Sequence, residues 1–239
     1  MLSKGVLKSG IRVNLNYITV MFDIPETPNI TSGETLGIDI GQTDLLSCSN
    51  GFQSVPDHHG HTLKSICEKL ARKKKGSKAF IKTQNHRTNF INHSINQLNL
   101  EGVKEVRIEN IKNLRKGRRT SKSLQHWNYP EIFGKLGVKC LDAGVQIKTI
   151  SPTYTSQRCS CCGWTRKANR RSKLFKCTSC GFKHDADLNA AVNISLSLKA
   201  ISKKERLMQI NRKGFYWLAS GQEPIVPVVK ETVDVSYNN

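Results

Sequence analysis

Two Cys-x-x-Cys-Gly motifs constrain this chain more than any other feature. They are Cys159-Ser-Cys-Cys162-Gly163 and Cys177-Thr-Ser-Cys180-Gly181, with 14 residues between the two cysteine pairs. Such spacing is typical of a Cys₄ zinc ribbon, in which each pair directs two thiolates at one ion. The glycine after each second cysteine can adopt the positive φ that the turn needs. The repeated glycine therefore selects Cys162, not Cys161, for the first pair.

The alternative reading of these cysteines is two redox or disulfide pairs. Against it, residues 1–10 contain no apolar signal sequence. A loop this short cannot build a core, and ordering each residue costs about 1–2 kcal/mol. Zinc, which contributes on the order of 10–16 kcal/mol in small fingers, could offset that cost. We therefore predict structural Zn²⁺ on Cys159, Cys162, Cys177 and Cys180. The other four cysteines are expected to be reduced, the first three of them buried: Cys48, Cys67, Cys140 and Cys161.

The charge of the chain indicates the class of partner. Its 239 residues include 38 Lys plus Arg and 18 Asp plus Glu, a formal net charge of +20. Such an excess favours a polyanion, with nucleic acid ahead of an anionic membrane surface. No apolar run approaches the ~18–20 residues of a membrane span. A hydrophobic content of 37% suffices for a globular core, so we expect a soluble protein of the cytoplasm.

Basic residues are concentrated in three segments. Lys64–Arg87 holds nine of them against one acid, Lys112–Lys122 holds six, and Pro152–His184 holds eight with no acid. Solvated helix faces are one explanation, but a single dominant sign favours phosphate-binding surfaces, the ribbon included. Trp127 and Tyr129 follow the second segment, where they could stack on bases or pack against the next helix.

Hydrophobic periodicity predicts alternating strands and helices. We expect strands over 36–41, 45–49, 103–111 and 145–150. A turn at Asn50-Gly51 follows the second strand, and the first two strands are expected to pair as a hairpin. Helices are expected around 63–70, 91–98 and 130–144, and a last one with Leu188, Ala191, Val192 and Ser195 on one face. One or two strands and a linker precede position 36. Beyond about 205 the pattern weakens, apart from a docked segment at 215–218 and a tail from 223.

Three acids lie at the ends of predicted elements. Asp39 lies on the opposite strand face from Leu36, Ile38 and Ile40, Glu109 ends a strand, and Asp187 follows the ribbon. Were they to converge within ~4 Å, each pair would repel by about 4 kcal/mol at an effective dielectric near 20. Such a cluster stays ionised only around cations, and carboxylates suit Mg²⁺. Surface acids with no connection to one another are the alternative.

The motifs around these acids resemble those of a known family. Leu36-Gly-Ile-Asp39-Ile-Gly41 and Val106-Arg-Ile-Glu109-Asn-Ile111 resemble the first two motifs of RuvC-type, RNase H-like nucleases. Tyr154-Thr-Ser-Gln157, continued through the ribbon to Asp187-Leu-Asn-Ala-Ala-Val-Asn-Ile194, resembles the third. A ribbon directly before the last acid is similar to transposon-encoded TnpB (OrfB) proteins, relatives of type V CRISPR effector nucleases. The resemblance runs from about Leu36 to Ile201.

This resemblance implies an RNA-guided DNA endonuclease with a mixed α/β, RNase H-like fold and an inserted ribbon. Asp39, Glu109 and Asp187 would bind two Mg²⁺ ions and hydrolyse phosphodiester bonds. Asp187 is preferred over Asp185 because the family's acid stands two residues before the Asn of Asn-Ala-Ala. The implied divisions are an N-terminal segment, a nuclease domain in two parts, a ribbon and a tail: 1–35, 36–157 with 182–205, 158–181 and 206–239.

One departure concerns the region before the first motif. Family members carry a much longer segment there, which holds the guide RNA and reads the target-adjacent DNA motif, whereas 35 residues precede Leu36 here. A fragment, a partner protein that supplies the region, and a minimal nuclease are the three explanations. Two other functions stay open. One is a guided binder without cleavage, and the other is a zinc-ribbon RNA-binding protein of the ribosomal kind.

Overall fold

The computed structural model describes residues 5–111 and 121–221. A four-stranded sheet with the order β4-β3-β5-β6 lies at its centre. β3 and β4 are antiparallel, while β3 pairs with β5, and β5 with β6, in parallel. The strands are β3 (Glu34–Ile40), β4 (Leu46–Cys48), β5 (Val103–Glu109) and β6 (Gln146–Ile150). The predicted mixed α/β class and the hairpin of the first two sheet strands are thus confirmed.

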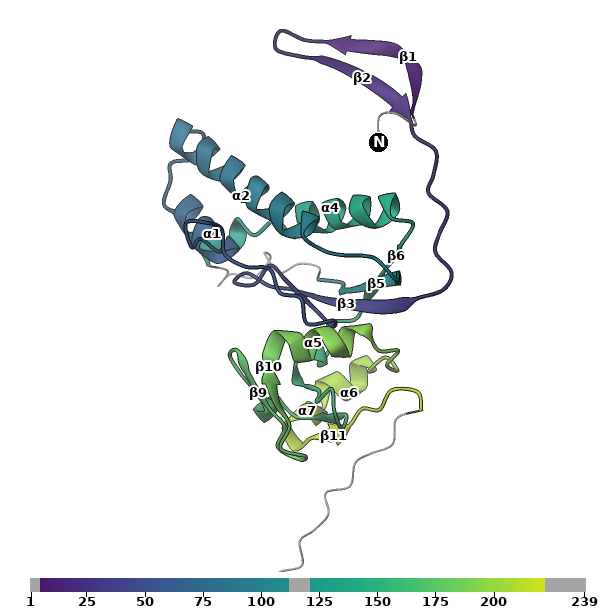
Figure 1. Cartoon of the computed structure of the whole chain (residues 1–239). Coiled ribbons are helices and arrows are strands. Elements are labelled where there is room, and N and C mark those ends of the chain that lie inside the picture. Colours follow the sequence, from purple (N-terminus) through teal and green to yellow (C-terminus); the bar gives the residue numbers. More distant parts are fainter. Residues whose placement is uncertain (1–4, 112–120, 222–239) are drawn as a thin grey trace, which may run out of the picture.

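Helices cover both faces of this sheet (Figure 1). One face carries α1 (Leu63–Ala71), α2 (Lys78–Asn96), α3 (Lys122–Gln125) and α4 (Tyr129–Asp142), and the other carries α5 (Ala186–Ser195). The apolar side chains of β3, at Leu36, Ile38 and Ile40, belong to the main core with Ile91 and Leu136. Asp39 points to the opposite face, as strand alternation requires. The sheet therefore separates the main apolar core, on the face of α1, α2 and α4, from the face that carries Asp39.

Helix α1 forms where the periodicity predicts it, whereas α2 begins at Lys78, well before the predicted 91–98, and the two helices make a helical hairpin. Thr62 caps α1 in a reciprocal pair with Ser65, and Ser77 caps α2 through the backbone N–H of Phe80. The basic run between the helices is exposed from Arg72 to Lys75. Arg87 differs from the rest of its segment, since it is buried and its guanidinium contacts Glu131 at 3.3 Å. One of the nine basic residues is therefore structural.

Helix α5 corrects one expectation about burial. The sequence pattern predicts a single apolar face made by Leu188, Ala191, Val192 and Ser195, but the buried residues include Asn189 and Asn193. The reason is that α5 lies between the sheet and the ribbon, so it is covered on two sides (Figure 1). Its polar side chains are buried because they bond to the ribbon, which no amphipathic pattern can indicate.

The second unit of the molecule lies beneath α5. It contains the short strands β7 (Trp164–Thr165), β8 (Arg170–Arg171), β9 (Leu174–Lys176), β10 (Lys183–Asp185) and β11 (Phe215–Tyr216), with α6 (Lys203–Leu207) and α7 (Ile210–Lys213). β11 pairs with β7 of the ribbon, and Trp217 is buried. The segment expected to dock at 215–218 therefore packs on the ribbon, and residues 206–221, which belong to the predicted tail, contain α7 and β11. The segment from Phe215 to Trp217 is held against the ribbon by the pairing of β11 with β7 and by the burial of Trp217.

The amino-terminal part is a hairpin of β1 (Val6–Val13) and β2 (Ile18–Asp23). Both strands are exposed along their length, and residues 24–33 join them to β3 (Figure 1). Most of the predicted basic segment 112–122, and the predicted tail from 223, lie outside the described residues. In the part of the chain that the structure describes, no helix combines the length and apolar character of a membrane span.

Candidate active site and metal centre

Asp39 and Glu109 come from neighbouring parallel strands. Ile38 of β3 pairs with Ile108 of β5, so the acids that follow them lie side by side at the carboxyl ends of the two strands. Thr155, in a short 3₁₀ turn after β6, donates its hydroxyl to Oε1 of Glu109. Tyr129 donates to the backbone carbonyl of the same residue. The glutamate is thus held by side chains from two further segments.

Asp187 reaches the same place from the first turn of α5. Gly37 makes this possible, because a Cβ at that position would lie 2.1 Å from the carbonyl oxygen of Ala191. The helix backbone therefore packs directly on β3, in the space that the glycine leaves on the face of Asp39. The face of β3 that carries Asp39 is accordingly covered by α5.

All three acids line one cavity of about 340 Å³, together with Gln42, Trp127, Ser156 and Arg170 among others. Among the described residues, they are not one of the groups whose ligand atoms all lie within 4.8 Å of one another. The sequence-derived acids thus share a cavity without forming a compact cluster. Trp127 is buried in the core beside them. Of its two predicted roles, packing is the one that the structure supports.

The electrostatics of the cavity favour a cation. Burial, with added repulsion from Glu109 and Asp187, raises the pKa of Asp39 from 3.8 to about 7. Burial also raises the pKa of Glu109, although the hydrogen bond from Thr155 works in the opposite direction. A divalent ion would favour the ionised form of both groups. The carboxylate donors present therefore fit Mg²⁺.

Two basic residues of the ribbon neutralise Asp187. Arg170 places a guanidinium nitrogen 2.6 Å from Oδ1, and Lys173 contacts Oδ2 while also bonding to Asp44. Neither was singled out from the sequence, where both counted among eight basic residues of one segment. Their spacing carries no distinguishing signal, because the fold of the ribbon directs them. The same holds for Thr155, which lies in the third motif without a predicted role.

Asp185 has a different position from Asp187. It is the N-cap of α5, where its Oδ1 accepts the backbone N–H groups of Asp187 and Leu188. It also accepts a 3.3 Å hydrogen bond from Gln53. Asp185 does not line the cavity of Asp39 and Glu109. The two aspartates are thus separated by function: one starts the helix and the other faces the cavity.

The four cysteines named from the sequence lie together. Their sulfurs are all within 4.8 Å of one another, with Sγ–Sγ distances of 3.7 Å for Cys159–Cys180 and 3.6 Å for Cys162–Cys177. A tetrahedral ion with Zn–S bonds of about 2.3 Å would give edges of about 3.8 Å. Cys161 is exposed and lies outside this group. The donor set and spacing therefore fit Zn²⁺.

The two cysteine turns repeat one hydrogen-bond pattern. The first cysteine of each pair donates its N–H five residues ahead, Cys159 to Trp164 and Cys177 to Phe182. The glycines accordingly have the positive φ that the motif requires, +77° at both Gly163 and Gly181. A hydrogen bond from Cys159, with backbone donors, lowers the pKa of Cys177 below its ordinary value, which favours its thiolate.

Buried polar contacts tie the ribbon to α5. The side-chain amides of Asn189 and Asn193 both donate to the backbone carbonyl of Arg158, at 2.8 and 2.7 Å. The Arg158 guanidinium donates to Asn193 and to the carbonyl of Trp217. Through these bonds the metal turn, the helix of Asp187 and the docked segment form one body. The ribbon thus positions the last acid.

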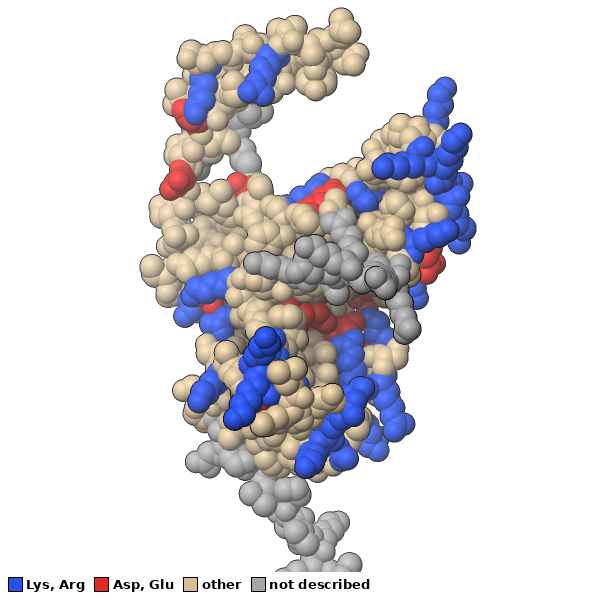
Figure 2. Space-filling model, turned by 180° about the vertical axis from the view of Figure 1, so that it is seen from behind, with Lys and Arg blue, Asp and Glu red and all other residues tan. Residues whose placement is uncertain are grey.

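Basic side chains surround the acids on the outside. Figure 2 shows Lys and Arg gathered at the tip of the helical hairpin and over the ribbon, with a strip of Asp and Glu between them. At the hairpin, eight of these residues are exposed: Lys64, Lys69, Arg72, Lys73, Lys74, Lys75, Lys78 and Lys82. A cationic surface on both sides of an acidic cavity can bind a polyanion that lies across the cavity.

Comparison with known proteins agrees with the motifs. The family model "Cas12f1-like, TNB domain" matches residues 129–194, which span α4, the ribbon and most of α5. The CRISPR-associated endodeoxyribonuclease Cas12f1 of Sulfoacidibacillus thermotolerans is 37% identical over 118 residues, which are 49% of this chain and 27% of that protein. The TnpB-like protein aq_aa05 of Aquifex aeolicus (strain VF5) is 35% identical over 37% of this chain and 31% of its own length.

A longer match covers the front of the chain as well. InsQ of Escherichia coli (strain K12), whose name gives a provisional assignment as an RNA-guided DNA endonuclease, is 26% identical over 82% of this chain and 57% of its own length. A Cas12f1–sgRNA–target DNA complex solved by cryo-EM is 24% identical, with a TM-score of 0.48 over 74% of this chain and 52% of that one.

The chain spans about a quarter of the first Cas12f1 relatives and just over half of InsQ. The residues matched by the family model include the four ribbon cysteines and Asp187. The predicted resemblance is therefore confirmed: this chain is a relative of the TnpB-like proteins and of the Cas12f endonucleases.

Proposed function

We propose that this chain is the nuclease part of a metal-dependent DNA endonuclease of the TnpB type. The observation that carries the proposal is the shared cavity of Asp39, Glu109 and Asp187. These acids come from three separate segments of the chain, and two of them have raised pKa values in a protein of charge +20. The names of relatives as endonucleases support the same activity.

In this proposal the residues of the chain hold and align the reacting groups. Asp39 and Glu109 are fixed on paired strands, Thr155 orients Glu109, and α5 carries Asp187 against β3. Two Mg²⁺ ions held by these carboxylates would activate a water molecule and stabilise the leaving oxygen of a phosphodiester. The basic residues of the hairpin and ribbon hold the nucleic-acid backbone across the cavity.

A pair of neighbouring substitutions tests the site. Asp187→Asn removes a carboxylate from the cavity, whereas Asp185→Asn retains an N-cap because asparagine caps helices about as well as aspartate. With labelled DNA, Mg²⁺ and the RNA that copurifies with the protein, we expect the first variant to cut at least about 100-fold more slowly, a loss of roughly 2.7 kcal/mol. The second should cut at close to the parent rate. Equal cutting by parent and Asp187→Asn would exclude this site.

The domains and partners follow from the same proposal. Residues 36–157 and 182–205 would form the RuvC-like nuclease, and 158–181 the zinc ribbon that also contacts nucleic acid. DNA is the proposed substrate and a guide RNA the proposed specificity factor, as the names of relatives suggest. A separate protein that supplies a longer front region is a further proposed partner. Sequencing of RNA and identification of protein that copurify with the chain would test both.

A second candidate function is guided binding without cleavage. The ion pairs of Arg170 and Lys173 with Asp187 favour it, because a neutralised aspartate does not need a metal. It predicts binding that weakens steeply with salt and yields no product that depends on Mg²⁺. Cleavage that requires Asp187 would exclude it.

A further inference from the structure

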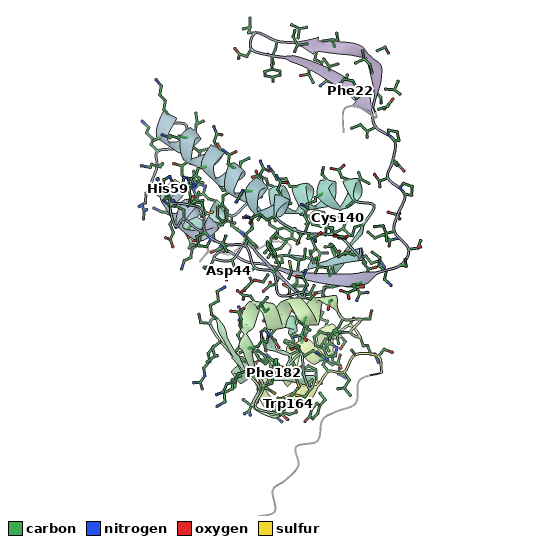
Figure 3. All side chains as sticks on the ribbon, viewed as in Figure 1. Phe22, Asp44, His59, Cys140, Trp164 and Phe182 are labelled. Atoms are coloured by element: carbon green, nitrogen blue, oxygen red, sulfur yellow. The ribbon has the colours of Figure 1, made fainter. Side chains whose placement is uncertain are left out.

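A second group of metal-type ligands lies away from the acids and the ribbon. Asp57 and His61 belong to the loop between β4 and α1, and His86 belongs to α2. Their ligand atoms all lie within 4.8 Å of one another. In Figure 3 the label of His59 marks this region, which lies next to α1 and far from Phe182. Neither proposed metal centre uses these residues.

The carboxylate of Asp57 is held in place by its own loop. Its Oδ1 accepts the backbone N–H groups of His59 and His61, each at 2.9 Å. Gly60 closes the turn with φ of +76° and donates its N–H to the carbonyl of Asp57. The side chain is only 14% exposed. These bonds orient the acid before any ligand arrives, so its ordering entropy is already lost on folding.

Both histidines direct a ring nitrogen at this carboxylate. Nε2 of His86 lies 2.7 Å from Oδ2, and Nδ1 of His61 lies 3.3 Å from Oδ1. The two rings are 5.3 Å apart and nearly perpendicular, so their nitrogens converge without the rings stacking. Each imidazole is about a third exposed, so an ion has access from solvent.

We propose that Asp57, His61 and His86 bind a divalent transition-metal ion that joins the β4–α1 loop to α2. Two imidazole nitrogens and one carboxylate oxygen form a donor set that suits Zn²⁺ and other borderline ions better than Mg²⁺. Three protein ligands leave at least one position for water or for a fourth side chain. His59, whose ring centre is 6.1 Å from that of His61, is the nearest further imidazole to that ring among those described.

Such an ion would affect the helical hairpin α1–α2, which carries the exposed basic residues. The loop that carries Asp57 and His61 leads directly into α1, and His86 lies near the middle of α2. An ion between them would restrain both helices that present the eight exposed basic residues. The site is therefore structural, and it would set the orientation of a surface that lies outside the acid cavity.

The test counts ions in the full chain. After overnight dialysis against buffered free Zn²⁺, elemental analysis should give two zinc ions per chain, one for the ribbon and one for this site. His86→Gln should contain one. His93→Gln is the matched control, since it removes an exposed histidine two turns further along the same helix, and it should retain two.

A second variant separates metal binding from folding of the loop. Asp57→Asn keeps an oxygen that can accept the N–H groups of His59 and His61, but it removes the charge that binds the ion. It should contain one zinc ion, keep the parent's circular dichroism spectrum, and lose the rise in melting temperature that added Zn²⁺ gives the parent. One zinc ion in the parent, or two in both His86→Gln and Asp57→Asn, would overturn the proposal.

Discussion

The cysteine cluster and the three acids of the cavity differ in where their side chains come from along the chain. The four cysteines lie within 22 residues and their turns repeat the same backbone bonds. Asp39, Glu109 and Asp187 come from two strands and a helix spread over most of the chain, and no repeated local bond holds them. One site is a property of a short segment. The other is a property of the whole fold.

The ribbon and the three acids are nevertheless connected. The ribbon holds α5 through Asn189 and Asn193, and it supplies Arg170 and Lys173 to Asp187. The segment of the four cysteines thus holds the helix of Asp187 and neutralises this one of the three acids that line the cavity. The ribbon is therefore part of what brings the acids together, and a change in the ribbon should also alter the cavity.

The largest effect should follow loss of the ribbon's zinc. Cys177→Ser removes one of four ligands, and the binding free energy of a structural ion, on the order of 10 kcal/mol, cannot be replaced by a core of this size. We expect loss of one zinc ion per chain, rapid proteolysis between residues 158 and 185, and loss of cleavage. Cys161→Ser is the control, because its thiol lies outside the cluster. A protease-resistant ribbon in Cys177→Ser would contradict the structural role of zinc.

The next effect concerns pH and Asp39. Its pKa is raised from 3.8 to about 7 in the fold, so the protonated form is favoured and ionisation costs stability. The cost is absent below about pH 4, grows as pH rises towards 7 and is constant above it. By 1.36 kcal/mol per pKa unit the full cost is roughly 4 kcal/mol.

Asp39→Asn should remove that cost. In buffer without Mg²⁺, with the ribbon's zinc retained, the variant should be more stable than the parent at pH 8 and about equal at pH 4, as measured by urea unfolding. Added Mg²⁺ should stabilise the parent and leave the variant nearly unchanged. A stability difference that is the same at both pH values would show that Asp39 is not the group responsible.

A smaller effect is expected from Gly37→Ala. The added Cβ would lie 2.1 Å from the carbonyl oxygen of Ala191, so α5 must move away from β3. We expect a loss of about 1–3 kcal/mol in unfolding free energy, with a fall in cleavage because Asp187 moves with the helix. Gly134→Ala on α4 is the control, since nothing lies within 4 Å of its Cβ, and it should stabilise the protein by about 1 kcal/mol. An unchanged Gly37→Ala would refute direct helix–strand packing.

The smallest effect should come from Arg170→Ala. Its guanidinium competes with a metal ion for Asp187, but the arginine side chain is 30% exposed and such pairs contribute about 1 kcal/mol or less. The Mg²⁺ concentration for half-maximal cleavage should therefore fall by a few fold. Arg171→Ala, an exposed neighbour, should leave it unchanged. A higher requirement for Mg²⁺ in Arg170→Ala would indicate that the arginine positions the acid instead.

Much of the fold follows from sequence periodicity. Alternation around Asp39 predicts both the strand and the face on which the acid lies, and the helical spacing of Leu63, Ile66 and Leu70 predicts α1. Which residues of α5 are buried cannot be predicted in this way, because the helix packs against both the sheet and the ribbon. The aromatic run at 215–218 predicts a docked segment, but only the pairing of β11 with β7 shows that the ribbon is its partner.

Features that depend on short-range geometry can be predicted from the order of residues: the cysteine spacing, the glycines at positive φ, and acids at strand ends. Which groups face one another across long separations depends on the packing of the folded chain. It placed Arg170 and Lys173 on Asp187, fitted α5 over Gly37, and brought His86 to Asp57. The physical reason is that turns and strands are governed by neighbours along the chain, whereas these contacts depend on how separate elements pack.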